Sequence, residues 1–135
     1  MKKLLVPLIV LIVAGAAMFV AIKPSTPAAA NEIKAEIQQA MQSGRTVFVQ
    51  LSTTSCVICR QMKPELEKLM AENGSQKRHF TINIDADAHQ ALASQFAVSG
   101  VPTQVILSND GRELFRHTGY MSYDEMKYAL AKAEN

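Results

Sequence analysis

The two cysteines of this 135-residue chain lie only two residues apart, as Cys56 and Cys59. They follow the run "TVFVQL" at residues 46–51, which is short, apolar and rich in β-branched residues, as is typical of a strand covered on both faces. Apolar residues then recur at helical spacing from Ile58 onward. The sequence therefore predicts a buried strand, a short loop after Ser52, and a helix that opens at the cysteine pair.

Such a pair can be a structural staple, half of a metal site or a redox centre. A staple suits an exported protein, but closing so small a loop removes little entropy from the unfolded chain. A tetrahedral zinc site needs two further ligands, and the candidates, His79, His89 and His117, are not paired at ligand spacing. A redox pair is the favoured interpretation, and the staple and the metal site remain alternatives.

A cysteine in the first turn of a helix has distinct chemistry. Unpaired backbone N–H groups and the positive end of the helix dipole stabilise a thiolate there, so we expect Cys56 to be the nucleophile. Cys59 lies three residues on, on the same helical face, and we expect it to be more buried and to resolve a mixed disulfide at Cys56. Arg60 adds a positive charge nearby, or is simply a solvated surface residue.

The patterns in the rest of the chain alternate between helices and strands. The expected elements are a helix with apolar residues Ile33, Ile37, Ala40 and Met41 that stops at Gly44, the strand at 46–51, the cysteine helix, a strand at 79–85, a short helix around Leu92 and Phe96, two strands around the turn Asn109-Asp110-Gly111, and a helix from Tyr123 to Ala133. This order predicts an α/β fold with a mixed four-stranded sheet flanked by helices.

The first 22 residues are suited to a membrane. Lys2 and Lys3 precede a stretch without charge at 4–22, which as a helix would span about 29 Å, close to the thickness of a hydrocarbon core. We expect a single-pass hydrophobic helix that anchors the chain. A cleaved signal peptide is the alternative, because Ala28 and Ala30 form a possible cleavage site.

Either interpretation exports the rest of the chain, because the two lysines keep the N-terminus in the cytoplasm. We expect a linker at 23–30 and one domain at 31–135 that faces the periplasm or the cell exterior, on a bacterial-type inner membrane if the anchor is retained. Beyond residue 30 the formal charge is −1, and no basic stripe with interleaved aromatics suggests a nucleic-acid partner.

Residues 31–135 resemble the thioredoxin family. The segment "VFVQLSTTSCVICRQMKPEL" matches the family's strand, CxxC motif and active-site helix, including a proline inside the helix at Pro64, and "NID" and "FAVSGVPTQVIL" match the segments that follow. The resemblance implies a thioredoxin fold in which Pro102 is cis and lies against the CxxC. It also implies that Val101, Pro102 and Thr103 bind an extended substrate segment.

Within the family, the chain is most similar to membrane-linked extracytoplasmic thiol reductases, especially the C-terminal domain of DsbD-type electron transporters. The Cys-Val-x-Cys motif and the hairpin "SNDGRELFRHTGYMS" carry this likeness. It implies an exported reductase of protein disulfides that needs no bound cofactor and is recharged by a membrane electron-transfer partner. The alternatives are a disulfide oxidase or isomerase, and a non-catalytic module that binds thiols or a metal.

Two positions depart from the family pattern. The family often has a buried acid six residues before the first cysteine, and this chain has Gln50 there. An aromatic residue commonly precedes that cysteine, and here the residue is Ser55. We expect Gln50 to modulate the exchange, because without the acid the proton of Cys59 has to leave through water or another group.

Overall fold

The computed structural model describes residues 27–74 and 77–135. Its elements follow the order that the sequence predicts. They are α2 (Pro27–Gln42), β1 (Thr46–Ser52), α3 (Val57–Met70), β2 (His79–Asp85), α4 (Gln90–Gln95), β3 (Thr103–Leu107), β4 (Glu113–Thr118) and α5 (Tyr123–Ala133).

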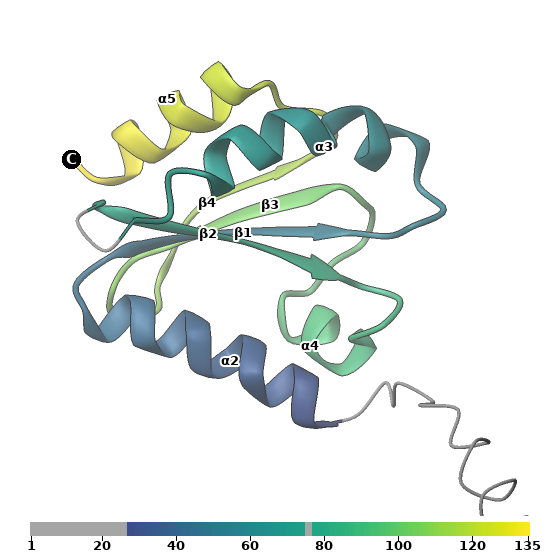
Figure 1. Cartoon of the computed structure of the whole chain (residues 1–135), viewed down its shortest axis with the longest axis horizontal. Coiled ribbons are helices and arrows are strands. Elements are labelled where there is room, and N and C mark those ends of the chain that lie inside the picture. Colours follow the sequence, from purple (N-terminus) through teal and green to yellow (C-terminus); the bar gives the residue numbers. More distant parts are fainter. Residues whose placement is uncertain (1–26, 75–76) are drawn as a thin grey trace, which may run out of the picture.

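The four strands form one mixed sheet in the order β2-β1-β3-β4. β1 runs parallel to β2 and antiparallel to β3, and β3 and β4 form the hairpin expected from the Asn-Asp-Gly turn. Gly111 in this turn has a φ of 85°, which glycine adopts without steric cost. Helices α3 and α5 cover one face of the sheet, and α2 and α4 cover the other (Figure 1). The predicted mixed four-stranded sheet is confirmed.

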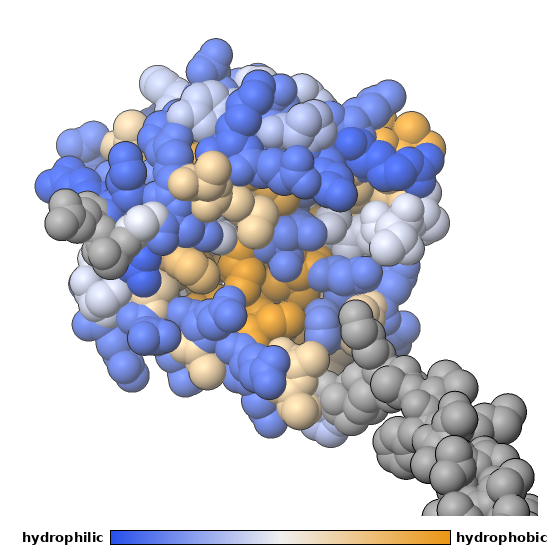
Figure 2. Space-filling model, viewed as in Figure 1, coloured by the Kyte–Doolittle hydropathy of each residue, from blue (hydrophilic) through white to orange (hydrophobic). Residues whose placement is uncertain are grey.

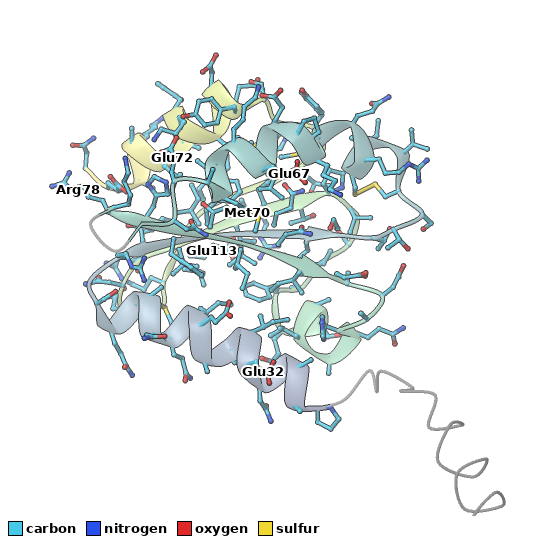
Figure 3. The ribbon with its side chains drawn as sticks, in the orientation of Figure 1. Glu32, Glu67, Met70, Glu72, Arg78 and Glu113 are labelled. Atoms are coloured by element: carbon cyan, nitrogen blue, oxygen red, sulfur yellow. A yellow bond between two sulfur atoms is a disulfide. The ribbon has the colours of Figure 1, made fainter. Side chains whose placement is uncertain are left out.

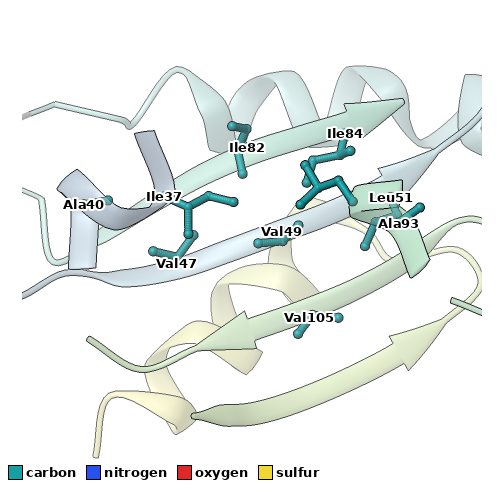
Figure 4. Close-up of a cluster of buried hydrophobic side chains, with 10 residues drawn as sticks. Ile37, Ala40, Val47, Val49, Leu51, Ile82, Ile84, Ala93 and Val105 are labelled. Atoms are coloured by element: carbon teal, nitrogen blue, oxygen red, sulfur yellow. The ribbon is translucent and has the colours of Figure 1, made fainter. Parts of the chain in front are cut away.

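Side chains of the central strand β1 alternate between two hydrophobic cores. Val47, Val49 and Leu51 belong to the core beneath α2 and α4 (Figure 4). Phe48 points to the opposite face, where it joins Met62 of α3 in the second core. Because period-two alternation fixes which face each residue occupies, Gln50 falls on the same face as Phe48, under α3.

The N-terminal boundary of the domain differs from the expected one. Helix α2 begins at Pro27, so residues 27–30 are helical and not part of an extended linker. The three alanines at 28–30 are strong helix formers. The predicted hydrophobic segment at 4–22 lies outside the described residues. Within residues 27–74 and 77–135, no helix has the length and apolar character needed to cross a bilayer.

The outer edge of β2 is partly closed by a side chain. Asn73, in the loop after α3, donates from Nδ2 to the carbonyl oxygen of Thr81 at 2.5 Å and accepts the Thr81 N–H at 2.7 Å. The amide thereby takes the place of a neighbouring strand at one edge residue, which limits unwanted pairing.

Figure 2 shows hydrophilic side chains over most of the face of the molecule that is seen in Figure 1, with a hydrophobic area between β2 and α2.

A polar cluster ties α3, β2 and α5 together at the end of the molecule away from the cysteines (Figure 3). The carboxylate of Glu72 accepts hydrogen bonds from Lys127, at 2.7 Å, and from the hydroxyl of Tyr123. These two bonds hold the pKa of Glu72 below its usual value. The buried His79 ring lies 3.8 Å from Glu72, and burial lowers the pKa of His79 from its ordinary 6.5.

This lowered pKa makes folding stability depend on pH. Unfolded His79 takes up a proton near its ordinary pKa of 6.5, whereas the buried imidazole does so only at lower pH. The unfolded state therefore binds more protons as the pH falls below 6.5, and the free energy of unfolding should decrease. Denaturant unfolding from about pH 5 to 8 should show this loss, and His79→Gln should flatten it. Equal pH dependence in both proteins would contradict the assignment.

Candidate active site

The cysteine pair lies where β1 gives way to α3. Cys56 is the N-cap residue of α3, and its sulfur accepts the backbone N–H of Cys59 at 3.1 Å. The two cysteines form a disulfide with their Cα atoms 5.2 Å apart, and Figure 3 shows its sulfur–sulfur bond near the start of α3. The CxxC disulfide and its position at the opening of a helix agree with the sequence prediction.

The two sulfurs differ in how accessible they are. Cys59 is 5% exposed, whereas Cys56 is only partly buried. Val57 and Ile58, between the two cysteines, are 55% and 42% exposed. The pair therefore presents one accessible sulfur within an apolar patch and keeps the other beneath it, as an exchange centre requires.

The loop before β3 lies against this accessible sulfur. The Val101-Pro102 peptide bond is cis, as the family resemblance implied, and the carbonyl oxygen of Val101 is 3.7 Å from the Cys56 sulfur. Thr103 is buried, and its hydroxyl donates to the Gly100 carbonyl at 2.6 Å. The side chain of Thr103 thus holds the loop together, while the backbone around Val101 borders Cys56.

Behind the pair, Gln50 is 1% exposed on the α3 face of β1. It lines a pocket of about 320 Å³ together with Cys59, so the residue that stands in for the family's acid faces the same pocket as the buried cysteine. Arg60 also lines this pocket and donates to the carbonyl of Thr54 at 3.1 Å. The Arg60 guanidinium therefore fixes the loop ahead of the cysteines and leaves positive charge at the pocket mouth.

A second buried glutamine, which the sequence patterns did not predict to be part of the site, lies beside Gln50. Gln104 of β3 is opposite Gln50 in the sheet register, is fully buried, and donates from Nε2 to the Gln50 Oε1 at 3.3 Å. The same Nε2 lies 3.4 Å from the sulfur of Met62. Gln104 was missed because it sits in the apolar run "TQVIL"; a lone polar residue at an inward strand position was the available signal.

The three histidines weighed as metal ligands occupy separate parts of the fold. His79 begins β2, His89 precedes α4 and His117 lies in β4. Across residues 27–74 and 77–135, no three His, Cys, Asp or Glu side chains are grouped as a metal site would require.

Comparison with known proteins identifies the family to which the chain belongs. A family model described as a thioredoxin-like domain matches residues 33–134. A thioredoxin from Mycolicibacterium smegmatis is 38% identical over 77 residues, which cover 57% of this chain and 68% of that protein. A thioredoxin from Alicyclobacillus acidocaldarius is 30% identical over 97 residues, covering 72% of this chain and 90% of the other.

Solved structures of thioredoxins share the fold of this chain. A thioredoxin from Nicotiana alata superposes with a TM-score of 0.65 at 25% identity, covering 76% of this chain and 85% of that one. A poplar thioredoxin h shares the fold with a TM-score of 0.66 at 20% identity, covering 82% and 94%. The thioredoxin fold is confirmed. The chain belongs to the thioredoxin-like family and is a thiol:disulfide oxidoreductase that acts on protein thiols and disulfides.

Proposed function

We propose that this protein is an exported reductase of protein disulfides, in which Cys56 is the attacking thiol and Cys59 the resolving thiol. The observation that carries the proposal is the asymmetry of the pair: Cys56 is accessible at the start of α3, and Cys59 is 5% exposed beneath it. The backbone N–H of Cys59 donates to the Cys56 sulfur, so a thiolate at Cys56 has a donor already in place.

The reaction takes two thiol–disulfide exchanges. The Cys56 thiolate attacks one sulfur of the substrate disulfide, which forms a mixed disulfide and releases the other substrate sulfur as a thiolate. Cys59 then loses its proton and attacks the Cys56 sulfur, so the second substrate sulfur leaves. Both substrate thiolates take up protons from water. The substrate gains two electrons, and the Cys56–Cys59 disulfide is the oxidised product.

Substrate recognition uses the surface around Cys56. The exposed apolar side chains of Val57 and Ile58 supply contact area, and the backbone at Val101 supplies polar atoms for an extended segment. Pro102 supports this backbone from a buried position. An extended strand that carries a disulfide and pairs with the backbone at Val101 would place its sulfur beside Cys56.

The direction of electron flow follows from the resemblance to membrane-linked reductases of the DsbD type. Within residues 27–74 and 77–135, only the six-residue helix α4 lies between β2 and β3, so no helical lid of the kind that favours an oxidase is inserted there. Electrons would come from a membrane partner, since residues 4–22 suit a membrane helix and thiol exchange needs no bound cofactor.

Substitution of each cysteine tests the two roles. Cys59→Ser should accumulate mixed disulfides with exported proteins, because the complex at Cys56 forms but is not resolved. Cys56→Ser should accumulate few, although it also retains one cysteine and is thus the matched control. Non-reducing electrophoresis after acid quenching reads out both. Trapping by Cys56→Ser, or by both variants equally, would refute the assignment.

Membrane fractionation tests the proposed location. If residues 4–22 anchor the chain, the protein should remain in membranes washed with alkaline carbonate, and its N-terminal peptide should include residues before Asn31. Protease added to the outer face of the inner membrane should digest the domain. A soluble product that begins near Asn31 would replace the anchor with a cleaved signal, and protection from the protease would exclude export.

A further inference from the structure

Two buried glutamines behind the cysteine pair form a hydrogen-bonded chain. The Gln104 Nε2 lies 3.2 Å from the carbonyl oxygen of Gly119 and 3.3 Å from Oε1 of Gln50. Gln104 is fully buried and Gln50 is 1% exposed. The chain therefore runs across the sheet beneath α3, from the end of β4 to the pocket that Gln50 shares with Cys59.

The backbone carbonyl of Gly119 sets the direction of this chain. A carbonyl only accepts, so Gln104 has to turn its NH₂ group toward Gly119. The same NH₂ group faces Gln50, which must then present its oxygen. The NH₂ group of Gln50 is consequently directed away from Gln104 and is available to the pocket beside Cys59. The carbonyl oxygen of Gly119 thus fixes which end of each amide group is nitrogen and which is oxygen.

The far end of the chain reaches the loop at the accessible cysteine. The backbone N–H of Gly119 donates to the carbonyl of Pro102 at 2.8 Å. Pro102 follows Val101, whose carbonyl oxygen borders the Cys56 sulfur. One set of hydrogen bonds therefore links the loop in front of the disulfide to the pocket behind it.

The same polarity leaves an acceptor without a partner. Oε1 of Gln104 is buried and has no hydrogen-bond partner among residues 27–74 and 77–135. An apolar residue of the same shape would remove this acceptor, but it would leave the Gly119 carbonyl and Oε1 of Gln50 without the donor that Gln104 gives them. What Gln104 contributes is therefore its NH₂ group, which sets the orientation of Gln50 at the pocket that Gln50 shares with Cys59.

We propose that Gln104 is a positioning residue that holds Gln50 with an N–H donor, and not an acceptor, facing Cys59. The proposal rests on the proposed function, because it concerns resolution of the mixed disulfide. The Gln50 donor stabilises the Cys59 thiolate that attacks Cys56, and the proton of Cys59 passes to water in the pocket. The charged groups that line the pocket are Arg60 and Lys63 from α3 and Asp85 from β2.

An aromatic disulfide reagent that releases a coloured thiolate separates the two exchanges. With reduced full-length protein, attack by Cys56 releases the first coloured thiolate, and resolution by Cys59 releases the second. Gln104→Leu should slow the second release about tenfold near neutral pH, as expected when a hydrogen bond to a charged group is lost. The pH profile of that step should move to higher pH. The first release should stay unchanged, as should both releases in the exposed control Gln39→Leu.

The double variant Gln50→Leu/Gln104→Leu separates positioning from folding. Gln104→Leu leaves Oε1 of Gln50 without its donor, whereas the double variant removes that oxygen as well. The unfolding midpoint of the double variant should therefore equal or exceed that of Gln104→Leu, while the second release stays slow. Recovery of the second release along with stability would overturn the proposal, as would an unchanged second release in Gln104→Leu. Absence of either release in the parent protein would instead refute the proposed function.

Discussion

The sulfur of Cys56 accepts the backbone N–H of Cys59, and the chemistry of the protein depends on this contact. It makes Cys56 the cap of helix α3, so folding of α3 also places a backbone N–H donor at the Cys56 sulfur. The position of the contact is set by β1, which lies between β2 and β3, and by Met62 and Leu66, which pack α3 onto the sheet. The central strand thus determines where the loop that carries the cysteines lies.

The core beneath α3 becomes polar toward the active site. Phe48 and Ile106 pair across β1 and β3 in an apolar layer, and the next inward pair along β1 is Gln50 with Gln104. Replacing an acid with an amide avoids the desolvation cost of a buried charge and removes a protein base from behind Cys59. A polar group thus lies behind the cysteine pair, and within the described part of the chain Oε1 of Gln104 has no hydrogen-bond partner.

Much of this architecture was predictable, for identifiable reasons. β-branched runs, period-two alternation and an Asn-Asp-Gly turn are local signals, and they located every strand and the cysteine helix. The start of α2 was not predictable because Pro27 and the alanines after it lack apolar periodicity. Nor were the partners of Gln104 and Asn73, since each bonds to atoms brought near only by the sheet. Sequence patterns identify inward positions, but hydrogen-bond direction depends on the assembled fold.

The reduction potential of the Cys56–Cys59 pair decides whether the protein is poised as a reductase or as an oxidant. A reductase that passes electrons to protein disulfides should have a potential near that of thioredoxins, about −270 mV, and well below the roughly −120 mV of a strong disulfide oxidant. Equilibration of the full-length protein with a thiol–disulfide buffer, followed by quantification of free cysteine, gives this value. A potential close to −270 mV is the expected result, and one close to −120 mV would contradict the reductase account.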